Sequence, residues 1–577
     1  MRLQEYWGVG PKTASLLSDA LGTEAAVAAI ESADSRALVD AGVAPGRATR
    51  ILRRANGGAG LDTLATRDAR DVYKDLLALA EEYAVTRHAA DRVRVLTPLT
   101  DRAEVEARLD AVEAAADSWR ALDDGERAAV LEAFETNDGA AGDLSAAETA
   151  VALAETGVES GAFAAVADLD TDALAEAAVA LRALDGEDRL GAGADDELDR
   201  LRDALGAVED MAADPDGVLA AVKESARDAS EFEAAFVRHV ADEAGLPSAE
   251  VRDAAPDGAV DASSFVTEGL RALATDLRTR ADERETAVAD DLRGRVADSR
   301  AELDRAVEAV DDLAFDVSLA RFTLAYDLTR PAVVEHDALA VEGARNLDLL
   351  EAGVDVRPVD YAVGDHDLAV PSGDRVAVLT GANSGGKTTV LETMCQVQLL
   401  ALMGLPVPAE AAEVGMVDSV VFHRRHASFN AGVLESTLRS VVPPLTRDGR
   451  TLMLVDEFEA ITEPGRAADL LHGLVTLTTE KAALGAFVTH LAGDLEPLPE
   501  RARVDGIFAE GLTPDLELEV DYQPRFGELG KSTPEFIVSR LVAEATDRGE
   551  RAGYEHLASA VGEEAVQRTL ADARWTG

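Results

Sequence analysis

Apolar residues along this chain change their spacing from one region to the next, and the change predicts the fold. From about Arg102 to Ala255, alanine and leucine recur at the steps of amphipathic helices. The breaks between these helices fall at Asn137-Asp-Gly, Gly191-Ala-Gly and Asp214-Pro-Asp-Gly. From 265 to 315 the apolar positions continue at mostly helical steps without a proline. The pattern therefore predicts a helical region that ends in one long helix.

This long helix has two interpretations. At about 1.5 Å of rise per residue it would reach well beyond a compact domain, as a lever paired with another helix or with a second subunit. Ordinary packing inside a helical bundle is the alternative, because the apolar seam covers only a few uneven heptads.

After Pro331 the pattern changes to short, nearly continuous apolar runs, which are typical of strands buried in a parallel sheet. The runs cover 332–335, 338–341, 376–380, 416–422, 451–456, 483–490 and 516–520. Helical segments separate several of them, so an α/β domain is expected in the last part of the chain.

The run at 376–380 breaks into a glycine loop and restarts as a helix. Gly381, Gly386, Lys387 and Thr388 fill the pattern G-x-x-x-x-G-K-[ST]. The other candidate nucleotide-binding residues of this stretch are Asn383, Ser384, Gly385 and Thr389. Backbone N–H groups of such a loop converge on phosphate, so Lys387 should contact the β- and γ-phosphates of ATP, and the Thr388 hydroxyl should bind Mg²⁺. A glycine-rich turn that matches by chance is the alternative.

Two further predicted strand ends carry complementary chemistry. The run at 451–456 ends in Asp456 and Glu457, and the run at 483–490 ends in His490. Because ligands collect at the carboxyl ends of parallel strands, Asp456 should hold the metal and Glu457 should orient the attacking water. His490 would sense the γ-phosphate, although a solvated surface histidine fits the same pattern.

Composition and charge indicate the environment in which the protein works. Among 577 residues no apolar stretch has the length of a membrane span, and the first residues lack a signal peptide, so a cytoplasmic protein is expected. Cys395 is the only cysteine, which excludes disulfides within the chain. The net charge is −55, and with six lysines among 55 basic residues the rest are arginine. This spread acidity is typical of proteins kept soluble in molar salt, whereas a surface that mimics nucleic acid is the competing interpretation.

The first residues carry candidate DNA contacts. Gly8, Gly10 and Lys12 belong to one Gly-Val-x-Pro stretch, and Gly42 and Arg47 belong to another. Such hairpins expose consecutive backbone amides that can bind phosphate. The stretch resembles a tandem helix-hairpin-helix DNA-binding domain whose second hairpin is degenerate, and a small helical bundle with glycine caps is the alternative. A flexible break is predicted after it, at 56–60.

The stretch from about 319 to 541 resembles the ATPase domain of the MutS family, of the ABC class of nucleotide-binding folds. The match is carried by the phosphate loop with its double glycine, by 399–408, by the Asp456-Glu457 pair and by Phe487-Val-Thr-His490. Residues 92–113 look like the start of that family's core, and the long helices look like its lever arms and clamp. The resemblance implies ATP, Mg²⁺, DNA and a homodimer.

Three departures from the family pattern matter. Ala382 replaces the usual proline of the loop, and Ala427 replaces a hydroxyl residue beside Ser428, the candidate for contacting the γ-phosphate bound by a partner subunit. No Phe-x-Glu wedge domain precedes the core, so mismatch reading by an intercalated aromatic is not expected. We also expect no nuclease domain after the ATPase.

We therefore predict a multi-domain protein with two all-α regions and a C-terminal α/β ATPase domain. The predicted parts are a helix-hairpin-helix domain at 1–56, a linker and helix at 57–91, a helical core with lever and clamp at 92–330, a P-loop ATPase domain at 331–545 and a helical tail at 546–577. The expected function is that of an ATP-gated dimeric clamp on double-stranded or branched DNA, without contact to a membrane. A ribosome-acting translation-quality ATPase and a DNA-structure binder without hydrolysis are the alternatives.

Overall fold

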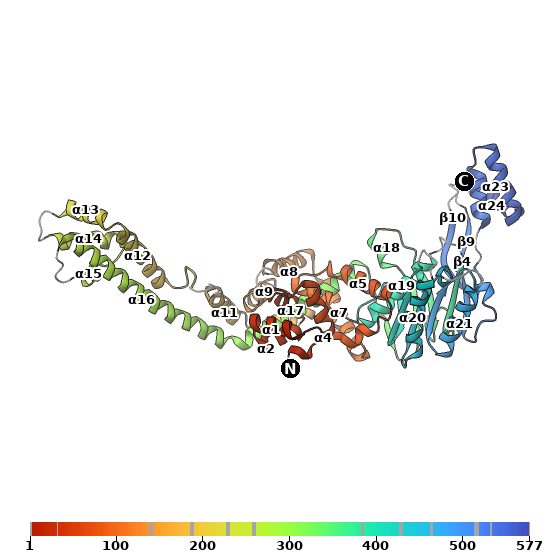
Figure 1. The fold of residues 1–577 in the computed structure, drawn as a ribbon, viewed down its shortest axis with the longest axis horizontal. Coiled ribbons are helices and arrows are strands. Elements are labelled where there is room, and N and C mark those ends of the chain that lie inside the picture. Colours follow the sequence, from red (N-terminus) through yellow and green to blue (C-terminus); the bar gives the residue numbers. More distant parts are fainter. Residues whose placement is uncertain are drawn as a thin grey trace. The chain divides into compact units, whose positions relative to one another are not determined.

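The computed structural model describes residues 3–31, 33–137, 142–184, 190–226, 231–256, 261–381, 386–425, 431–461, 466–512, 518–530 and 534–575. The chain forms two compact units, one of residues 1–127 with 312–577 and one of residues 128–311. Strands occur only in the last part of the described chain, as Figure 1 shows, which confirms the predicted division into helical and α/β regions.

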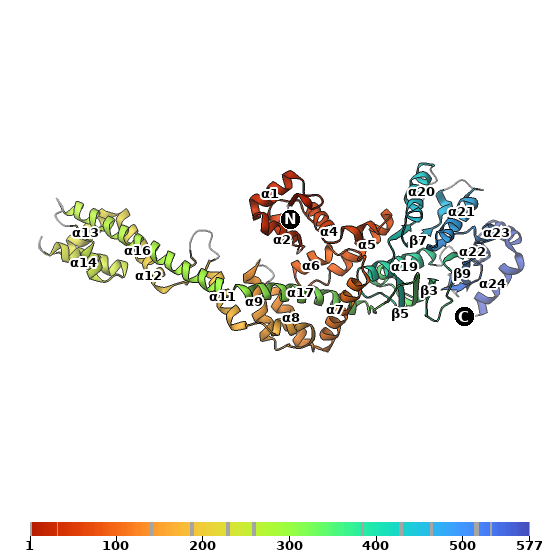
Figure 2. The same ribbon diagram turned by 90° about the horizontal axis from the view of Figure 1, so that it is seen from below.

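The first unit begins with four helices that pack around a small apolar core (Figure 2). They are α1 (Pro11–Leu21), α2 (Thr23–Glu31), α3 (Ser35–Asp40) and α4 (Pro45–Asp62). Prolines open α1 and α4, where a missing N–H costs no intrahelical hydrogen bond. Leu17, Ile30 and Ile51 are fully buried between these helices.

The flexible break predicted at 56–60 is wrong, because α4 continues through these glycines to Asp62. A Cβ atom on Gly60 would lie 1.7 Å from the carbonyl oxygen of Pro98. At this position, glycine therefore permits close packing against a neighbouring segment, and it does not interrupt the helix.

The chain after α4 joins the edge of a sheet. The Ala65 N–H donates to the Val420 carbonyl at 3.1 Å, and the Val420 N–H donates to the Thr63 carbonyl at 2.7 Å. The helices that follow are α5 (Arg67–Glu81), α6 (Arg87–Arg94) and α7 (Arg102–Ala121). Thr66 caps α5 and also bonds both backbone groups of Phe422, so this segment is fixed to the sheet.

A six-stranded sheet in the order β10-β9-β4-β8-β7-β6 holds the candidate site. Its strands are β4 (Val376–Gly381), β6 (Ser419–His423), β7 (Thr451–Asp456), β8 (Leu484–Val488), β9 (Ala502–Leu512) and β10 (Leu518–Phe526). All neighbouring pairs are parallel except β9 with β10. Every residue of β4, β7 and β8 is buried, which explains their continuous apolar sequences.

A second sheet of four strands has the order β1-β5-β2-β3. Its strands are β1 (Ala332–Val334), β2 (Ala338–Ala344), β3 (Val359–Gly364) and β5 (Ala411–Gly415). The helices of this part are α18 (Leu347–Glu351), α19 (Lys387–Leu402), α20 (Ala431–Thr446), α21 (Ala467–Glu480), α22 (Pro534–Glu544), α23 (Arg548–Val561) and α24 (Glu563–Trp575). The sequence patterns did not predict β3, β5 or β9.

The second unit is entirely helical among its described residues. Its helices are α9 (Asp143–Glu155), α10 (Ala164–Ala167), α11 (Thr171–Leu184), α12 (Asp196–Ala213), α13 (Pro215–Ser225), α14 (Phe232–Ala244), α15 (Ser248–Asp253) and α16 (Ala262–Asp298). Two more helices, α8 (Asp124–Asn137) and α17 (Arg300–Ala325), belong partly to each unit.

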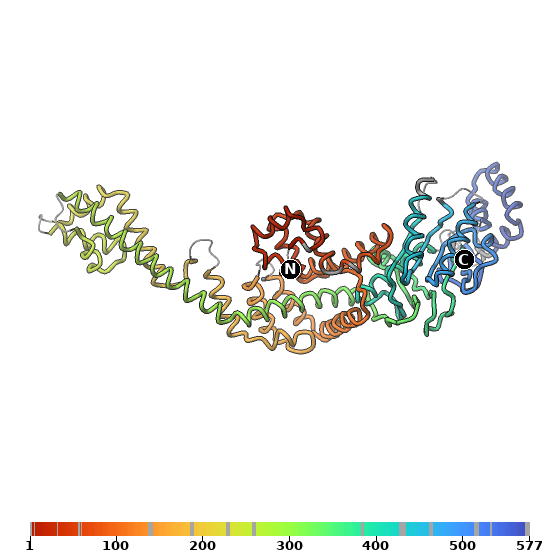
Figure 3. Tube along the Cα trace, turned by 60° about the horizontal axis from the view of Figure 1, so that its bottom comes forward, coloured from red at the N-terminus to blue at the C-terminus, as the bar shows by residue number. Residues whose placement is uncertain are grey.

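The predicted long helix is two helices, because α16 ends at Asp298 and α17 begins at Arg300 (Figure 3). Leu270, Leu273 and Leu277 of α16 are buried in one core with α12 and α14. For this stretch the structure agrees with packing inside a helical bundle.

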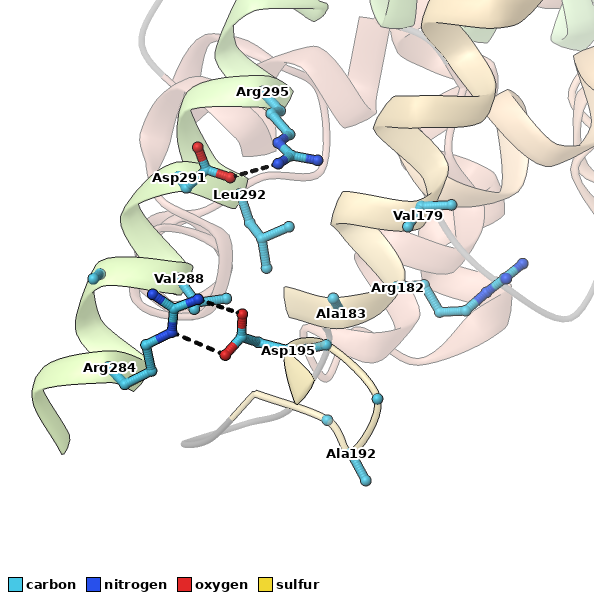
Figure 4. A pocket seen from close by; sticks show the side chains of 14 residues that line it. Val179, Arg182, Ala183, Ala192, Asp195, Arg284, Val288, Asp291, Leu292 and Arg295 are labelled. Atoms are coloured by element: carbon cyan, nitrogen blue, oxygen red, sulfur yellow. Dashed lines mark hydrogen bonds and ion pairs between the residues drawn. The ribbon is translucent and has the colours of Figure 1, made fainter. Parts of the chain in front are cut away.

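A hollow of about 600 Å³ lies between α11, the residues before α12, and α16 (Figure 4). Arg284 pairs through two nitrogens with Asp195, at 2.9 and 2.6 Å, and Arg295 pairs with Asp291 at 2.8 Å. The third arginine of the hollow, Arg182, pairs with Glu148. Each arginine of the hollow therefore has a carboxylate partner that balances its charge.

Candidate nucleotide-binding site

The phosphate loop joins the carboxyl end of β4 to the first residue of α19. Gly381 has a φ of 125°, and a Cβ there would lie 1.9 Å from the Ile507 carbonyl oxygen of β9. Gly386 has a φ of 74° and precedes α19. Both glycines are therefore required by the backbone. The predicted site residues Asn383, Ser384 and Gly385 lie outside the described residues.

Lys387 is the first residue of α19 and is buried. Its Nζ donates to the Gly381 carbonyl oxygen at 2.9 Å, so the side chain folds back over the loop. Burial lowers the pKa of Lys387, while the charges of Glu457 and Asp456 act in the opposite direction. A buried cation at the start of a helix is arranged to attract a phosphate group.

Thr388 and Asp456 are brought together from α19 and the end of β7. The Thr388 hydroxyl donates to Asp456 Oδ2 at 2.8 Å. Burial raises the pKa of Asp456, whose other oxygen, Oδ1, is buried without a hydrogen-bond partner among the described residues.

These two oxygen donors fit Mg²⁺, which prefers hard oxygen ligands and leaves other positions to water and phosphate. In the described part of the chain, no cluster of three or more His, Cys, Asp or Glu side chains could hold a metal by itself. Thr388 and Asp456 supply two oxygen donors, which leaves the other positions of such an ion to water and phosphate oxygens.

Glu457 follows Asp456 with a φ of 41°, and its N–H donates to the Val488 carbonyl at 3.0 Å. Its Oε1 lies 2.9 Å from His490 Nε2, and its Oε2 lies 2.8 Å from Arg425 Nη1. The hydrogen bond from His490, followed by the nearby positive charges, lowers the pKa of Glu457 against the effect of burial. The structure thus places His490 on Glu457, and sequence reasoning missed Arg425.

A third carboxylate, Glu459, was also missed. Its Oε1 accepts hydrogen bonds from the His490 N–H and from the Thr489 hydroxyl, both at 2.7 Å. Glu459 therefore fixes the backbone that carries His490. The sequence signal was present as a third acidic residue, two positions after Glu457, but its partner His490 lies about thirty positions away in the chain.

Beside the phosphate loop lies a cavity of about 350 Å³. Gly386 and Thr389 line one side, and Val356, Arg357 and Tyr522 line other parts. The Arg357 guanidinium lies 5.8 Å from the Tyr522 ring, and Tyr522 is partly exposed. An aromatic ring and apolar side chains next to a phosphate loop form a surface suited to a nucleobase.

The remaining predicted site residues are Ser428 and those of the two N-terminal hairpins. Ser428 lies outside the described residues. In the first hairpin Gly8 has a φ of 79°, and in the second Gly42 has a φ of 95°. Arg47 Nη2 donates to the Gly8 carbonyl at 3.0 Å, which joins the two hairpins. Gly10 and Lys12 flank the start of α1.

The sheet order, the loop between β4 and α19, and the acidic end of β7 together define a nucleotide-binding domain of the P-loop class. A family model described as MutS domain V matches residues 377–442. Between the Pyrococcus furiosus DNA-binding protein MutS2 and this chain, 41% of 247 aligned residues are identical, over 42% of each chain. Over the aligned residues the chain is therefore similar to a MutS2 protein, and residues 377–442 are similar to MutS domain V.

Two other relatives match the chain over similar lengths. The Thermomicrobium roseum endonuclease MutS2 is 33% identical over 248 residues, which cover 40% of this chain and 29% of the relative. The Granulibacter bethesdensis DNA mismatch repair protein MutS is 32% identical over 228 residues, which cover 37% of this chain and 24% of the relative. The matches thus span less than half of these relatives. Within the described residues no helix has the length and apolarity needed to cross a bilayer.

Proposed function

We propose that this chain binds ATP with Mg²⁺ and hydrolyses it. The observation that carries the proposal is the contact between Thr388 and Asp456. Thr388 directly follows the buried Lys387, and Asp456 directly precedes Glu457. Thr388 and Asp456 would hold Mg²⁺, which, when bound, neutralises negative charge on the phosphates. Lys387 would bind the phosphates, and the base would occupy the cavity beside Tyr522.

Hydrolysis requires a group that orients water toward the γ-phosphorus. Glu457 has that role in the proposal, because it is half-buried at the end of β7 beside the metal-binding carboxylate. His490 positions the Glu457 carboxylate through its 2.9 Å contact, and Glu459 positions His490. The role of sensing the γ-phosphate also falls to His490.

The relatives named as DNA-binding and DNA mismatch repair proteins support DNA as the partner. We assign the DNA contacts to Gly8, Gly10, Lys12, Gly42 and Arg47. Backbone groups and positive side chains at these hairpins would bind phosphates without reading sequence. Residues 1–62 contain seven basic and seven acidic residues, so this region has no net charge in a chain of net charge −55. Local neutrality reduces repulsion from DNA.

In the proposal two copies of the chain form composite sites, in which Ser428 of one copy contacts the γ-phosphate bound by Lys387 and Thr388 of the other. ATP would then favour the closed dimer, and hydrolysis would release it, since a ligand shifts an equilibrium by its differential affinity. The helical regions would form a clamp on branched or distorted DNA, with a role in repair or recombination.

An assay of ATP binding and turnover in molar KCl with Mg²⁺ tests the proposal. Wild type should bind and hydrolyse ATP, Lys387→Ala should lose nucleotide binding, and Lys481→Ala, a matched change of an exposed lysine, should retain both. Forked and four-way-junction DNA should stimulate turnover more than intact or mismatched duplex. A folded wild-type protein without affinity for ATP would contradict the proposal.

A further inference from the structure

Trp7 stands out on the surface of the N-terminal helices. Its side chain is 58% exposed, although the whole chain has only three tryptophans and 4% aromatic residues. A tryptophan ring exposed to this degree presents a flat apolar face that is accessible for stacking. Trp7 directly precedes Gly8 of the first hairpin.

An internal repeat indicates that packing does not require this ring. The stretch Gly8-Val-Gly-Pro11 recurs as Gly42-Val-Ala-Pro45, and both valines are buried. A Cβ atom on Gly8 would lie 3.2 Å from Ile51 of α4, and one on Gly42 would lie 3.5 Å from Leu16 of α1. Each hairpin thus packs against the helix that follows the other hairpin.

In this repeat the counterpart of Trp7 is Ala41, which is 6% exposed. At the position before the hairpin glycine, the second hairpin has the small buried side chain of Ala41, whereas the first has the large exposed side chain of Trp7. The two hairpins share their backbone turns but differ in what they present to a ligand.

The surroundings of Trp7 favour an anionic partner with flat rings. The Arg54 guanidinium of α4 lies 5.6 Å from the Trp7 ring centroid and also pairs with the exposed Asp62 carboxylate at 3.0 Å. Arg47 of the same helix is exposed and is held against Gly8, and Lys12 is exposed at the start of α1. A stacking surface next to positive charges is the combination that binds single-stranded nucleic acid.

We propose that Trp7 stacks on an unpaired base, so that the first hairpin binds DNA where duplex passes into single strand. The inference rests on the proposed DNA binding by the hairpins and narrows its substrate to forked or otherwise unpaired DNA. The second hairpin, with Ala41, would contact duplex phosphates only.

Fluorescence anisotropy with two labelled DNAs tests this assignment, one a blunt duplex and the other the same duplex with two unpaired arms, in the same KCl concentration. Trp7→Ala should weaken binding of the forked DNA about tenfold and change binding of the blunt duplex by less than about twofold. Trp7→Phe should keep most of the preference, since its ring still stacks. Leu557→Ala, which removes another exposed apolar side chain, should have no effect.

Thermal unfolding of each variant should match wild type, because Trp7 is largely outside the core. Equal loss of affinity for both DNAs, or unchanged affinity in Trp7→Ala, would overturn the role of Trp7 while leaving hairpin binding intact. A wild-type protein that binds neither DNA would instead overturn the DNA-binding part of the proposed function, and this inference with it.

Discussion

Arg425 Nη1 lies 2.8 Å from Glu457 Oε2, and this ion pair joins the residues after β6 to the end of β7. With His490 on the other oxygen, both oxygens of the proposed water-orienting carboxylate contact a basic side chain. The carboxylate is held firmly, but Oε2 must exchange its partner before it can accept a proton from water.

Replacing Arg425 with methionine should therefore raise the turnover of ATP. The ion pair has one exposed partner and is worth up to about 1 kcal/mol, so the increase should be roughly fivefold at most. Steady-state kinetics in saturating ATP measures it. Arg424→Met is the matched control, since Arg424 pairs with Glu392 instead of Glu457. A fall in turnover for Arg425→Met alone would mean that Arg425 assists the reaction.

The contact between Thr66 and Phe422 yields a second prediction. The Thr66 hydroxyl donates to the Phe422 carbonyl at 2.6 Å, and its oxygen accepts from the Phe422 N–H at 3.1 Å. Thr66→Val leaves both buried groups unpaired, which should cost about 1–3 kcal/mol and lower the melting temperature. Thr279→Val, at an exposed helical threonine, should change it little.

Because Thr66 lies between α4 and the sheet, Thr66→Val should also weaken stimulation of the ATPase by DNA more than it weakens basal turnover. The ratio of the two rates measures this coupling. An unchanged ratio in a destabilised variant would show that the contact is structural only.

A third prediction concerns pH. Burial, together with the charge of Asp312, raises the pKa of Asp316 in α17 to about 6. Since this folded-state pKa exceeds the unfolded value, Asp316 favours the folded state below about pH 4, and that contribution is lost as the pH rises through 6. Asp316→Asn should therefore stabilise the protein at pH 8, by about 1–3 kcal/mol, and have little effect near pH 4.

Melting temperatures of Asp316→Asn and wild type across this range measure the difference. The exposed Asp282→Asn serves as control. A difference that stays constant with pH would exclude the titration of Asp316 as its cause.

Much of the site could be predicted because its signals are local. The turn from β4 into α19 and the acidic end of β7 each occupy one short stretch of sequence, and the parallel sheet brings their ends together. Arg425, Glu459 and Tyr522 could not be assigned in this way, since their roles depend on partners contributed by other segments.

Two predictions differ from the structure. The glycines at 56–60 predict a break by composition, yet α4 continues through them, and the backbone of Pro98 approaches Gly60 more closely than a Cβ atom would allow. The spacing of apolar residues across 265–315 does not predict the interruption at Ser299, which separates α16 from α17. Periodicity carries no information about the contact of Gly60 with Pro98 or about the end of α16 at Asp298.

We propose that two copies of this chain bind ATP between them, that the bound ATP closes the dimer on DNA, and that hydrolysis opens the dimer again. The most direct test is to measure dimer content and retention of DNA by Glu457→Gln in ATP, Mg²⁺ and molar KCl. We predict that this variant binds ATP, hydrolyses it at least about a hundredfold more slowly than wild type, and accumulates as a DNA-bound dimer. Hydrolysis at the wild-type rate, or a variant that binds ATP but stays monomeric without retaining DNA, would contradict the claim.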